Sequence, residues 1–231
     1  MAIKTIPYIF VLTILKNRGA SNEIFFIIPF ISFFLYAQSE FIDSSDFAVK
    51  VGFNYSGSDI FTGRGVDISG SILGIFDLGL QYANSETSNS PFKSSGNLYY
   101  IAFNTKRGSS RNCIKILLGY VDETVTNEFY PDFRVTGPVA GLDLFLKVSE
   151  NETVTFMPDL GVMYGFLSVD TKGIYNISGL DDARSIFLDL NFKINLSNQY
   201  HMLFTPSVSK DLVNSDNPLM FGVEVGFLLN Q

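Results

Sequence analysis

Apolar and polar residues alternate in short stretches through most of the chain after residue 45. In Asp46–Ser56 every second residue is apolar, and the set is Phe47, Val49, Val51, Phe53 and Tyr55. Successive side chains of a β-strand point to opposite faces, so this period of two predicts a strand with one apolar face and one small or polar face.

The same alternation recurs and predicts ten strands, with eight as the alternative count. In chain order they span residues 46–56, 66–73, 76–83, 98–104, 114–121, 138–148, 154–167, 185–195, 200–209 and 218–229. Most of these lengths are close to the roughly 9–11 residues that a tilted transmembrane strand requires.

The predicted connections alternate in length. Short links lie near Gly74 and at residues 149–152 and 196–199, whereas polar stretches at 84–96, 122–136 and 170–184 suggest longer loops. Short turns at one rim and longer loops at the other are typical of transmembrane barrels. We therefore predict an all-β fold, an antiparallel up-and-down transmembrane β-barrel. An even number of strands puts both termini at the short-turn rim.

Composition supports strands over helices as the membrane-crossing elements. Apolar residues make up 46% of the chain and charged residues only 17%, which is apolar for a soluble domain. Beyond the first forty residues, no apolar run approaches the roughly 20 residues that a membrane helix needs.

The N-terminus has the features of an export signal. Lys16 and Arg18 precede the apolar block 23–37, which Ala37 closes, so we predict a signal peptide over residues 1–37 with cleavage after Ala37. Residues 1–14 add a second apolar stretch, and we expect translation to start at Leu15 from a non-AUG codon. A tandem anchor of two short helices is the alternative. Residues 38–45 would be a short periplasmic lead-in, and residues 46–229 the barrel.

Residues 46–229 resemble the small outer-membrane β-barrel proteins, the OmpA/OmpX-like superfamily in its broad sense. The resemblance rests on the alternation, on hairpins such as SGSILGIFDLGLQY and on the closing strand, and Leu-Tyr-Ala-Gln looks like a signal-peptide exit of the Bacteroidetes type. Many such barrels end on an aromatic residue, whereas here Leu-Leu-Asn-Gln follows Phe227. The resemblance implies a bacterial outer-membrane location, with lipid and the barrel-assembly machinery as partners. It indicates no particular ligand for the extracellular loops.

If the apolar rows face lipid, the opposite rows line the lumen. A lysine at the bilayer midplane costs roughly 2–4 kcal/mol, so an inward position near opposite charges is favoured. Ten strands enclose only a narrow lumen, which we expect side chains to fill. The predicted lumen-lining charge network comprises Lys50, Asp67, Asp77, Lys115, Asp143, Lys147, Asp159, Asp189, Lys193 and Glu224. Its function is either structural, stiffening the barrel, or that of a gated ion path or a ligand cavity.

The sequence offers little catalytic or metal-binding chemistry. His201 is the single histidine and lies beside a short turn, and Cys113 is the single cysteine, which we interpret as a small residue at a strand start. One His and one Cys cannot make a zinc site, and Asp181 and Asp182 lack a calcium-loop pattern. We therefore predict no catalytic residue, no metal and no cofactor. The net charge of −7 without a basic stripe argues against nucleic acid as a partner.

Four functions fit these features. The first is a non-enzymatic outer-membrane barrel with a structural or surface-binding function, and the second is a narrow channel or small-solute transporter. A barrel hydrolase using His201 is the third. The fourth is a soluble exported binder of the lipocalin kind, with the apolar rows inside. Alternation alone does not separate this last reading from a membrane barrel.

Overall fold

The structure is a computed structural model that describes residues 47–87, 92–105, 112–127, 132–171, 178–213 and 218–230. The predicted signal peptide, the lead-in and the proposed start at Leu15 lie outside these residues. The strands are β1 Phe47–Gly57, β2 Phe61–Ile72, β3 Phe76–Thr87, β4 Phe92–Asn104, β5 Asn112–Asn127, β6 Phe133–Leu146, β7 Ser149–Glu150, β8 Val154–Thr171, β9 Ser178–Asn195, β10 Tyr200–Asp211 and β11 Met220–Asn230. Among the described residues, no helix is long and apolar enough to cross a bilayer.

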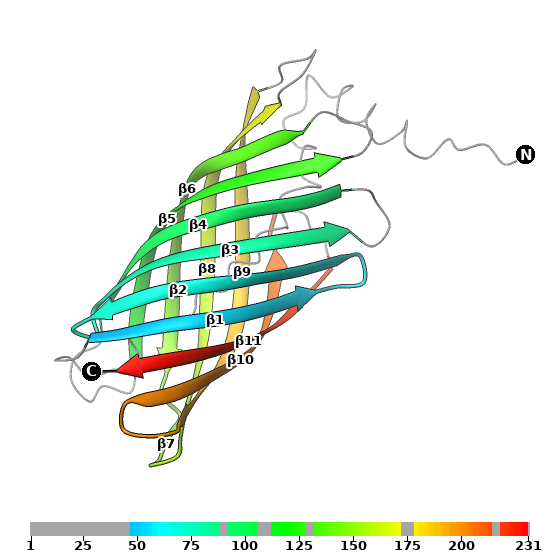
Figure 1. Ribbon diagram of the computed structural model, residues 1–231. Helices are drawn as coiled ribbons and strands as arrows, with labels where there is room; N and C mark the ends of the chain where they lie inside the picture. Colours follow the sequence, from blue (N-terminus) through cyan, green and yellow to red (C-terminus); the bar gives the residue numbers. More distant parts are fainter. Residues whose placement is uncertain are drawn as a thin grey trace, which may run out of the picture.

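The ten long strands form a closed antiparallel barrel (Figure 1). Each long strand pairs with the next long strand along the chain, β6 pairs directly with β8, and β1 pairs with β11 to close the sheet. The two-residue β7 adds only a short pairing against β8. Closure leaves none of the long strands with a free edge, so backbone groups pair between neighbouring strands without water wherever the ladders are continuous. The predicted fold class and the count of ten membrane-length strands are confirmed.

The two ends of the barrel differ in which parts of the chain they hold. We call the end where β1 begins and β11 ends the terminal rim, and the opposite end the loop rim; Figure 1 marks the C-terminus at the terminal rim. The connections after β2, β4, β6 and β9 lie at the terminal rim. Those after β1, β3, β5, β8 and β10 lie at the loop rim.

The long loops predicted at the loop rim are largely strand, so this prediction is wrong. β5 continues to Asn127 and β6 begins at Phe133, which turns most of 122–136 into a hairpin, and the stretches 84–96 and 170–184 are shortened in the same way. The outward residues there, such as Asp122 and Thr124, are polar. Apolar alternation therefore ends before the backbone ladder does, because hydrogen bonding between strands does not require an apolar face.

The β2–β3 turn contains a strained backbone. Ile75 N donates to Ile72 O at 3.1 Å, and Leu73 and Gly74 both have positive φ, at 58° and 61°. Positive φ at both central residues is the geometry of a type I′ turn, which favours Asn-Gly. A leucine there carries a steric cost that asparagine largely avoids.

We expect Leu73→Asn to raise the free energy of unfolding by roughly 1 kcal/mol, because asparagine tolerates the left-handed conformation that this turn imposes. Urea unfolding of the refolded barrel in detergent would measure the change. Gly74→Ala is the matched control and should lower stability. An equal or lower midpoint for Leu73→Asn would contradict the turn geometry.

Candidate functional site: the charged interior of the barrel

A lysine with two acidic partners lies in the interior where the first and last strands meet. Lys50 Nζ of β1 lies 2.9 Å from Asp67 Oδ2 of β2 and 3.0 Å from Glu224 Oε1 of β11, and the lysine is 0% exposed. Gly52 provides the space, because a Cβ there would collide with both carboxylates. This triad ties together three neighbouring strands from opposite ends of the chain.

A second ion pair spans β4. Lys115 Nζ of β5 lies 3.1 Å from Asp77 Oδ2 of β3, and both side chains are buried. On β4, Ala102 pairs in register with Asp77, and Asn104 pairs with Lys115, so the two charged residues are offset by two residues along the intervening strand. Tyr100 packs its ring over Gly79 and interacts electrostatically with Lys50 and Lys115.

Tyr100 was missed by sequence reasoning. Its position in the alternation could have revealed it. Tyr100 lies two residues from Leu98 and from Ala102 and therefore shares their face of the strand, and both of these residues are buried in the interior. Adjacent Tyr99 made the face ambiguous, since either tyrosine could have been the outward one.

The wall made by β8, β9 and β10 carries carboxylates joined by amide and hydroxyl groups. Asn191 Nδ2 donates to Asp159 Oδ2 at 2.9 Å, and Thr205 Oγ1 donates to Asn191 Oδ1 at 3.0 Å. This bridge crosses the β9–β10 ladder where Pro206 follows Thr205 and the pairing is interrupted. Asp189 lies opposite Asp159 in register and interacts electrostatically with Asp143 of β6.

The structure buries eight of the ten charged residues predicted to line the lumen. These are Lys50, Asp67, Asp77, Lys115, Asp143, Asp159, Asp189 and Glu224. Lys193 is only partly buried, on the same strand as His201's partner Asn195. Lys147 follows the end of β6, its side chain is 18% exposed, and its Nζ lies 2.8 Å from Glu150 Oε2 of the exposed β7, so its position in the lumen stays a prediction.

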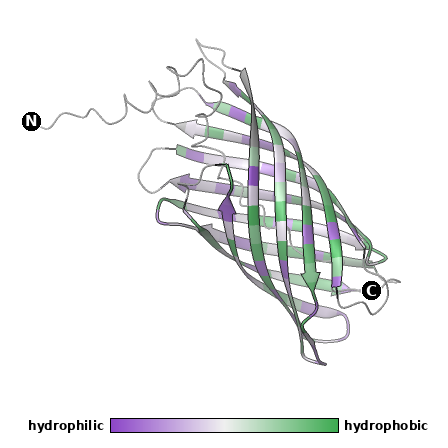
Figure 2. Cartoon of the chain, turned by 180° about the vertical axis from the view of Figure 1, so that it is seen from behind, coloured by the Kyte–Doolittle hydropathy of each residue, from purple (hydrophilic) through white to green (hydrophobic). Residues whose placement is uncertain are grey.

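The outer face of the barrel is an apolar belt between two aromatic girdles. Figure 2 shows hydrophobic and hydrophilic residues alternating along the strands. Exposed aromatics near the terminal rim include Phe47, Phe76, Phe103, Tyr200 and Phe227, and those toward the loop rim include Tyr55, Tyr82, Tyr99, Tyr120, Phe166 and Phe221. Exposed Leu, Ile and Val side chains lie between them. An apolar outer band flanked by aromatic girdles is typical of barrels that cross a bilayer.

No known protein-family model and no curated protein sequence matches the chain. Among solved structures, the translocator domain of the autotransporter NalP from Neisseria meningitidis covers 82% of this chain and 90% of its own length, with a TM-score of 0.50 and 11% identity. The β domain of the Bordetella autotransporter BrkA covers 81% and 99%, with a TM-score of 0.50 and 12% identity. At such identities the likeness concerns the fold. The chain has the fold of outer-membrane β-barrels.

The location of this outer-membrane barrel follows from the fold and the belt together. The barrel is closed, and its outer face is a continuous band of exposed Leu, Ile, Val and Phe, which is suited to contact with the hydrocarbon of a bilayer. The protein is therefore located in the bacterial outer membrane. The soluble lipocalin-like reading is wrong, because it required the apolar rows to pack in the centre and the charged rows to face water.

Two apolar layers flank the charged middle of the outer-membrane barrel, and sequence reasoning did not anticipate them. The layer near the terminal rim comprises Ala48, Cys113, Phe145, Met157, Leu203 and Leu228. The second cluster extends toward the loop rim and includes Leu117, Val121, Val125, Val135, Val169 and Phe61. β5 is apolar on both faces over much of its length, so alternation did not reveal which of its residues point inward.

The residues considered for catalysis or metal binding, His201 and Cys113 among them, lie apart from one another in the barrel. His201 is buried, and its Nδ1 lies 2.9 Å from Asn195 Oδ1 beside the β9–β10 turn at the terminal rim. Cys113 lies in the apolar layer near that rim. Within the described part of the chain, no three His, Cys, Asp or Glu side chains are grouped to hold a metal ion. The side chains of Asp181 and Asp182 lie outside what the structure describes.

One buried acid lies beyond the lipid-facing part of the barrel. On β5 the outward residues after Tyr120 are polar, so Glu123 is nearer the loop rim than the belt. Its inward side chain is nevertheless buried, between the inward Val121 and Val125 of the same strand. Burial raises the pKa of Glu123 to about 7, and a hydrogen bond from Ser94 offsets part of that rise.

We expect Glu123→Gln to raise the free energy of unfolding by roughly 2–3 kcal/mol at pH 8 and by little at pH 4. Because the folded-state pKa of Glu123 lies above the unfolded value of 4.5, the folded state binds the proton more tightly. The stabilisation from this protonation is fully present below pH 4.5 and is lost as the pH rises through about 7. Urea titrations at pH 4, 6 and 8 would measure it. Glu86→Gln, an exposed acid on β3, should show no such trend. A pH-independent effect of Glu123→Gln would refute the raised pKa.

Proposed function

We propose that the protein is a non-enzymatic outer-membrane barrel whose narrow lumen is closed by its own side chains, and that it has a structural or surface-binding function. The observation that carries this proposal is the burial of the central charged residues: Lys50, Asp143 and Glu224 are each 0% exposed. A water-filled pore would leave side chains in the middle of the barrel accessible. The buried charges would then act as a network that fixes the relative positions of the strands.

The width of the barrel and the layering of its interior support this proposal. Ten strands are only slightly more than the eight whose interior is just filled by side chains, whereas general porins use about 16. The charged layer lies between two apolar layers, and the one near the terminal rim contains the large Phe145 and Leu228, both essentially unexposed. An apolar layer of this kind opposes the passage of hydrated ions.

Planar-bilayer recording tests the closed lumen. The refolded protein should give no steady conductance steps under conditions in which a general porin conducts. A Phe145→Ala/Leu228→Ala variant, which opens the apolar layer near the terminal rim, should conduct more than the parent protein. Gel migration with and without boiling would show that both proteins insert folded. Stable conductance steps of the parent protein would overturn the proposal.

A narrow cation-selective channel is the second candidate, because of the charge of the lumen. The buried inward residues of the described strands include six acids predicted at the outset (Asp67, Asp77, Asp143, Asp159, Asp189 and Glu224) but only two lysines. Fixed negative charge in a low-dielectric tube attracts cations. If steps occur, the reversal potential across a KCl gradient should show preference for K⁺ over Cl⁻.

A further inference from the structure

Near the loop rim, three neighbouring strands carry no large side chain at one level of the inner wall. Gly65 of β2, Ala83 of β3 and Gly96 of β4 are paired in register at this level. Ala83 faces the interior, because it follows the outward Tyr82, and yet it is partly exposed. Ala102 also faces the interior and is only 5% exposed. Open space therefore lies above Ala83, and we call this place the Ala83 recess.

Two polar side chains extend over the glycines from opposite sides of the Ala83 recess. Asn54 of β1 is in register with Gly65, and Glu123 of β5 is in register with Gly96. A Cβ at Gly65 would lie 2.7 Å from Asn54 Oδ1, and a Cβ at Gly96 would lie 2.9 Å from Glu123 Cβ. The two glycines thus make room for an amide and a carboxyl group, which flank Ala83 in the same row of the wall.

Three buried polar atoms around the recess have no hydrogen-bond partner among the described residues. They are Asn54 Nδ2, Gln81 Nε2 and Glu123 Oε1. Gln81 lies two residues from Ala83 on the same inward face of β3, and it is 3% exposed. Glu123 is also held by a hydrogen bond from Ser94, which leaves Oε1 for another donor. Because a buried polar atom without a partner destabilises the fold, three of them around one space indicate a ligand that supplies the missing partners.

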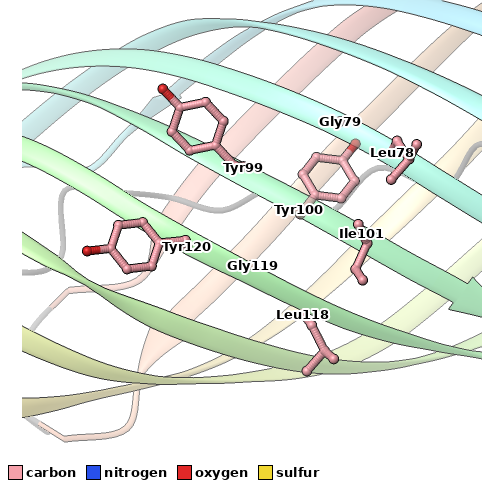
Figure 3. A pocket seen from close by; sticks show the side chains of 8 residues that line it. All are labelled: Leu78, Gly79, Tyr99, Tyr100, Ile101, Leu118, Gly119 and Tyr120. Carbon is pink, nitrogen blue, oxygen red and sulfur yellow. The ribbon is translucent and has the colours of Figure 1, made fainter.

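The recess lies on the loop-rim side of the lipid-facing belt. Figure 3 shows Tyr99 of β4 and Tyr120 of β5, two outward tyrosines that are in register and belong to the girdle toward the loop rim. Gly96 and Glu123 each lie three residues farther toward the loop rim, which is roughly 10 Å along the strand. A ligand would therefore come from the aqueous phase at the loop rim and not from the bilayer.

We propose that the Ala83 recess binds a sugar through two neighbouring hydroxyl groups. This names a ligand class for the surface-binding function proposed above, on which it rests. A hydroxyl group both donates and accepts, so a pair of them can accept from Asn54 Nδ2 and Gln81 Nε2 and donate to Glu123 Oε1. An alkylammonium ion cannot accept from the two amides, and a carboxylate cannot donate to Glu123.

The charge of the neighbouring interior also favours a neutral ligand. Gln81 is in register with Asp67, and the triad of Lys50, Asp67 and Glu224 contains one lysine and two acids. A ligand carboxylate at the Gln81 amide would lie beside this excess of negative charge. An amino-acid zwitterion therefore fits less well than a sugar.

Isothermal titration calorimetry of the refolded barrel, in a detergent without a sugar head group, tests the ligand class. The probes are D-glucose, D-galactose and D-mannose, with ethylammonium, acetate and glycine as comparators. We expect saturable binding of at least one sugar and weaker binding of all three comparators. If no sugar binds saturably, or if a comparator binds more tightly than every sugar, the proposal is wrong. The conductance of the parent protein bears on the closed lumen and not on the recess, so the two proposals can fail separately.

Two variants test the site itself. Gln81→Met removes one amide donor and should weaken sugar binding about fivefold, the contribution of one hydrogen bond. The same change should raise the urea midpoint of the sugar-free protein, because it removes a buried donor that has no partner among the described residues. Ala83→Val fills the recess and should abolish binding, whereas Ala140→Val, on the exposed outer face of β6, is the matched control and should not.

Gel migration without boiling would show that each variant is folded. Sugar binding that is unchanged in Gln81→Met would overturn the assignment of this amide, and binding unchanged in Ala83→Val would overturn the site. If Ala83→Val fails to fold, the opposite effects of Gln81→Met on binding and on stability still decide the question, since a residue with a purely structural function would not show both.

Discussion

Lys50→Met is expected to lower the free energy of unfolding by roughly 3–5 kcal/mol, the largest effect predicted for this barrel. Methionine fills a similar volume but leaves the carboxylates of Asp67 and Glu224 buried without their lysine. Removing one member of a buried ion pair leaves its partner's charge buried without compensation. The resulting loss of stability is larger than the stability that the intact pair contributes. Urea unfolding in detergent or lipid vesicles at neutral pH would measure the loss.

Two further variants isolate the cause of this loss. Lys147→Met removes a lysine whose partner Glu150 is 56% exposed at the side chain, and it should cost less than about 1 kcal/mol. The triple variant Lys50→Met/Asp67→Asn/Glu224→Gln also removes the two uncompensated carboxylates. It should recover most of the lost free energy of unfolding, even if the single variant fails to fold. If Lys50→Met costs no more than Lys147→Met, the buried triad is not what holds β1, β2 and β11 together.

Leu160→Lys is expected to cost roughly 2–4 kcal/mol in phospholipid vesicles, because it puts a charge on the outer face near the bilayer midplane. Leu160 is 50% exposed on β8 and lies opposite Leu144 and Leu188 on the neighbouring strands. The comparison requires a bilayer, since a detergent micelle adapts to a charge more easily. Equilibrium unfolding from vesicles would give the difference.

Ser168→Lys is the matched control for Leu160→Lys. Ser168 lies on the same face of the same strand, two residues beyond the aromatic Phe166, and a lysine there should cost no more than about 1 kcal/mol. Similar costs at the two positions would mean that the belt between the girdles does not contact hydrocarbon, and the assignment of the outer face would fail.

The sequence was sufficient to predict which side chains share a face wherever the alternation of apolar and polar residues is unbroken. In β9 the row containing Leu188 and Leu190 and the row containing Asp189 and Asn191 separate cleanly, and the structure turns the first outward and buries the second. Alternation fixes which residues share a face because backbone geometry alone dictates it. Strand count and hairpin order followed from the same local rule.

Local pattern failed where a residue's environment depends on distant strands. The end of β5 remains strand beyond Tyr120 although its outward residues are polar, because the ladder with β4 and β6 continues in water. Apolar residues on both faces of β5 concealed the inner apolar cluster.

The sequence by itself determined that the chain makes ten two-faced strands and which side chains lie together on each face. Only the tertiary structure decided that the charged faces turn inward and which charges meet. Lys50 and Glu224 are 174 residues apart and become neighbours solely because the last strand pairs with the first. The alternation of a strand is a local property, whereas the partner of a buried charge depends on how the sheet closes.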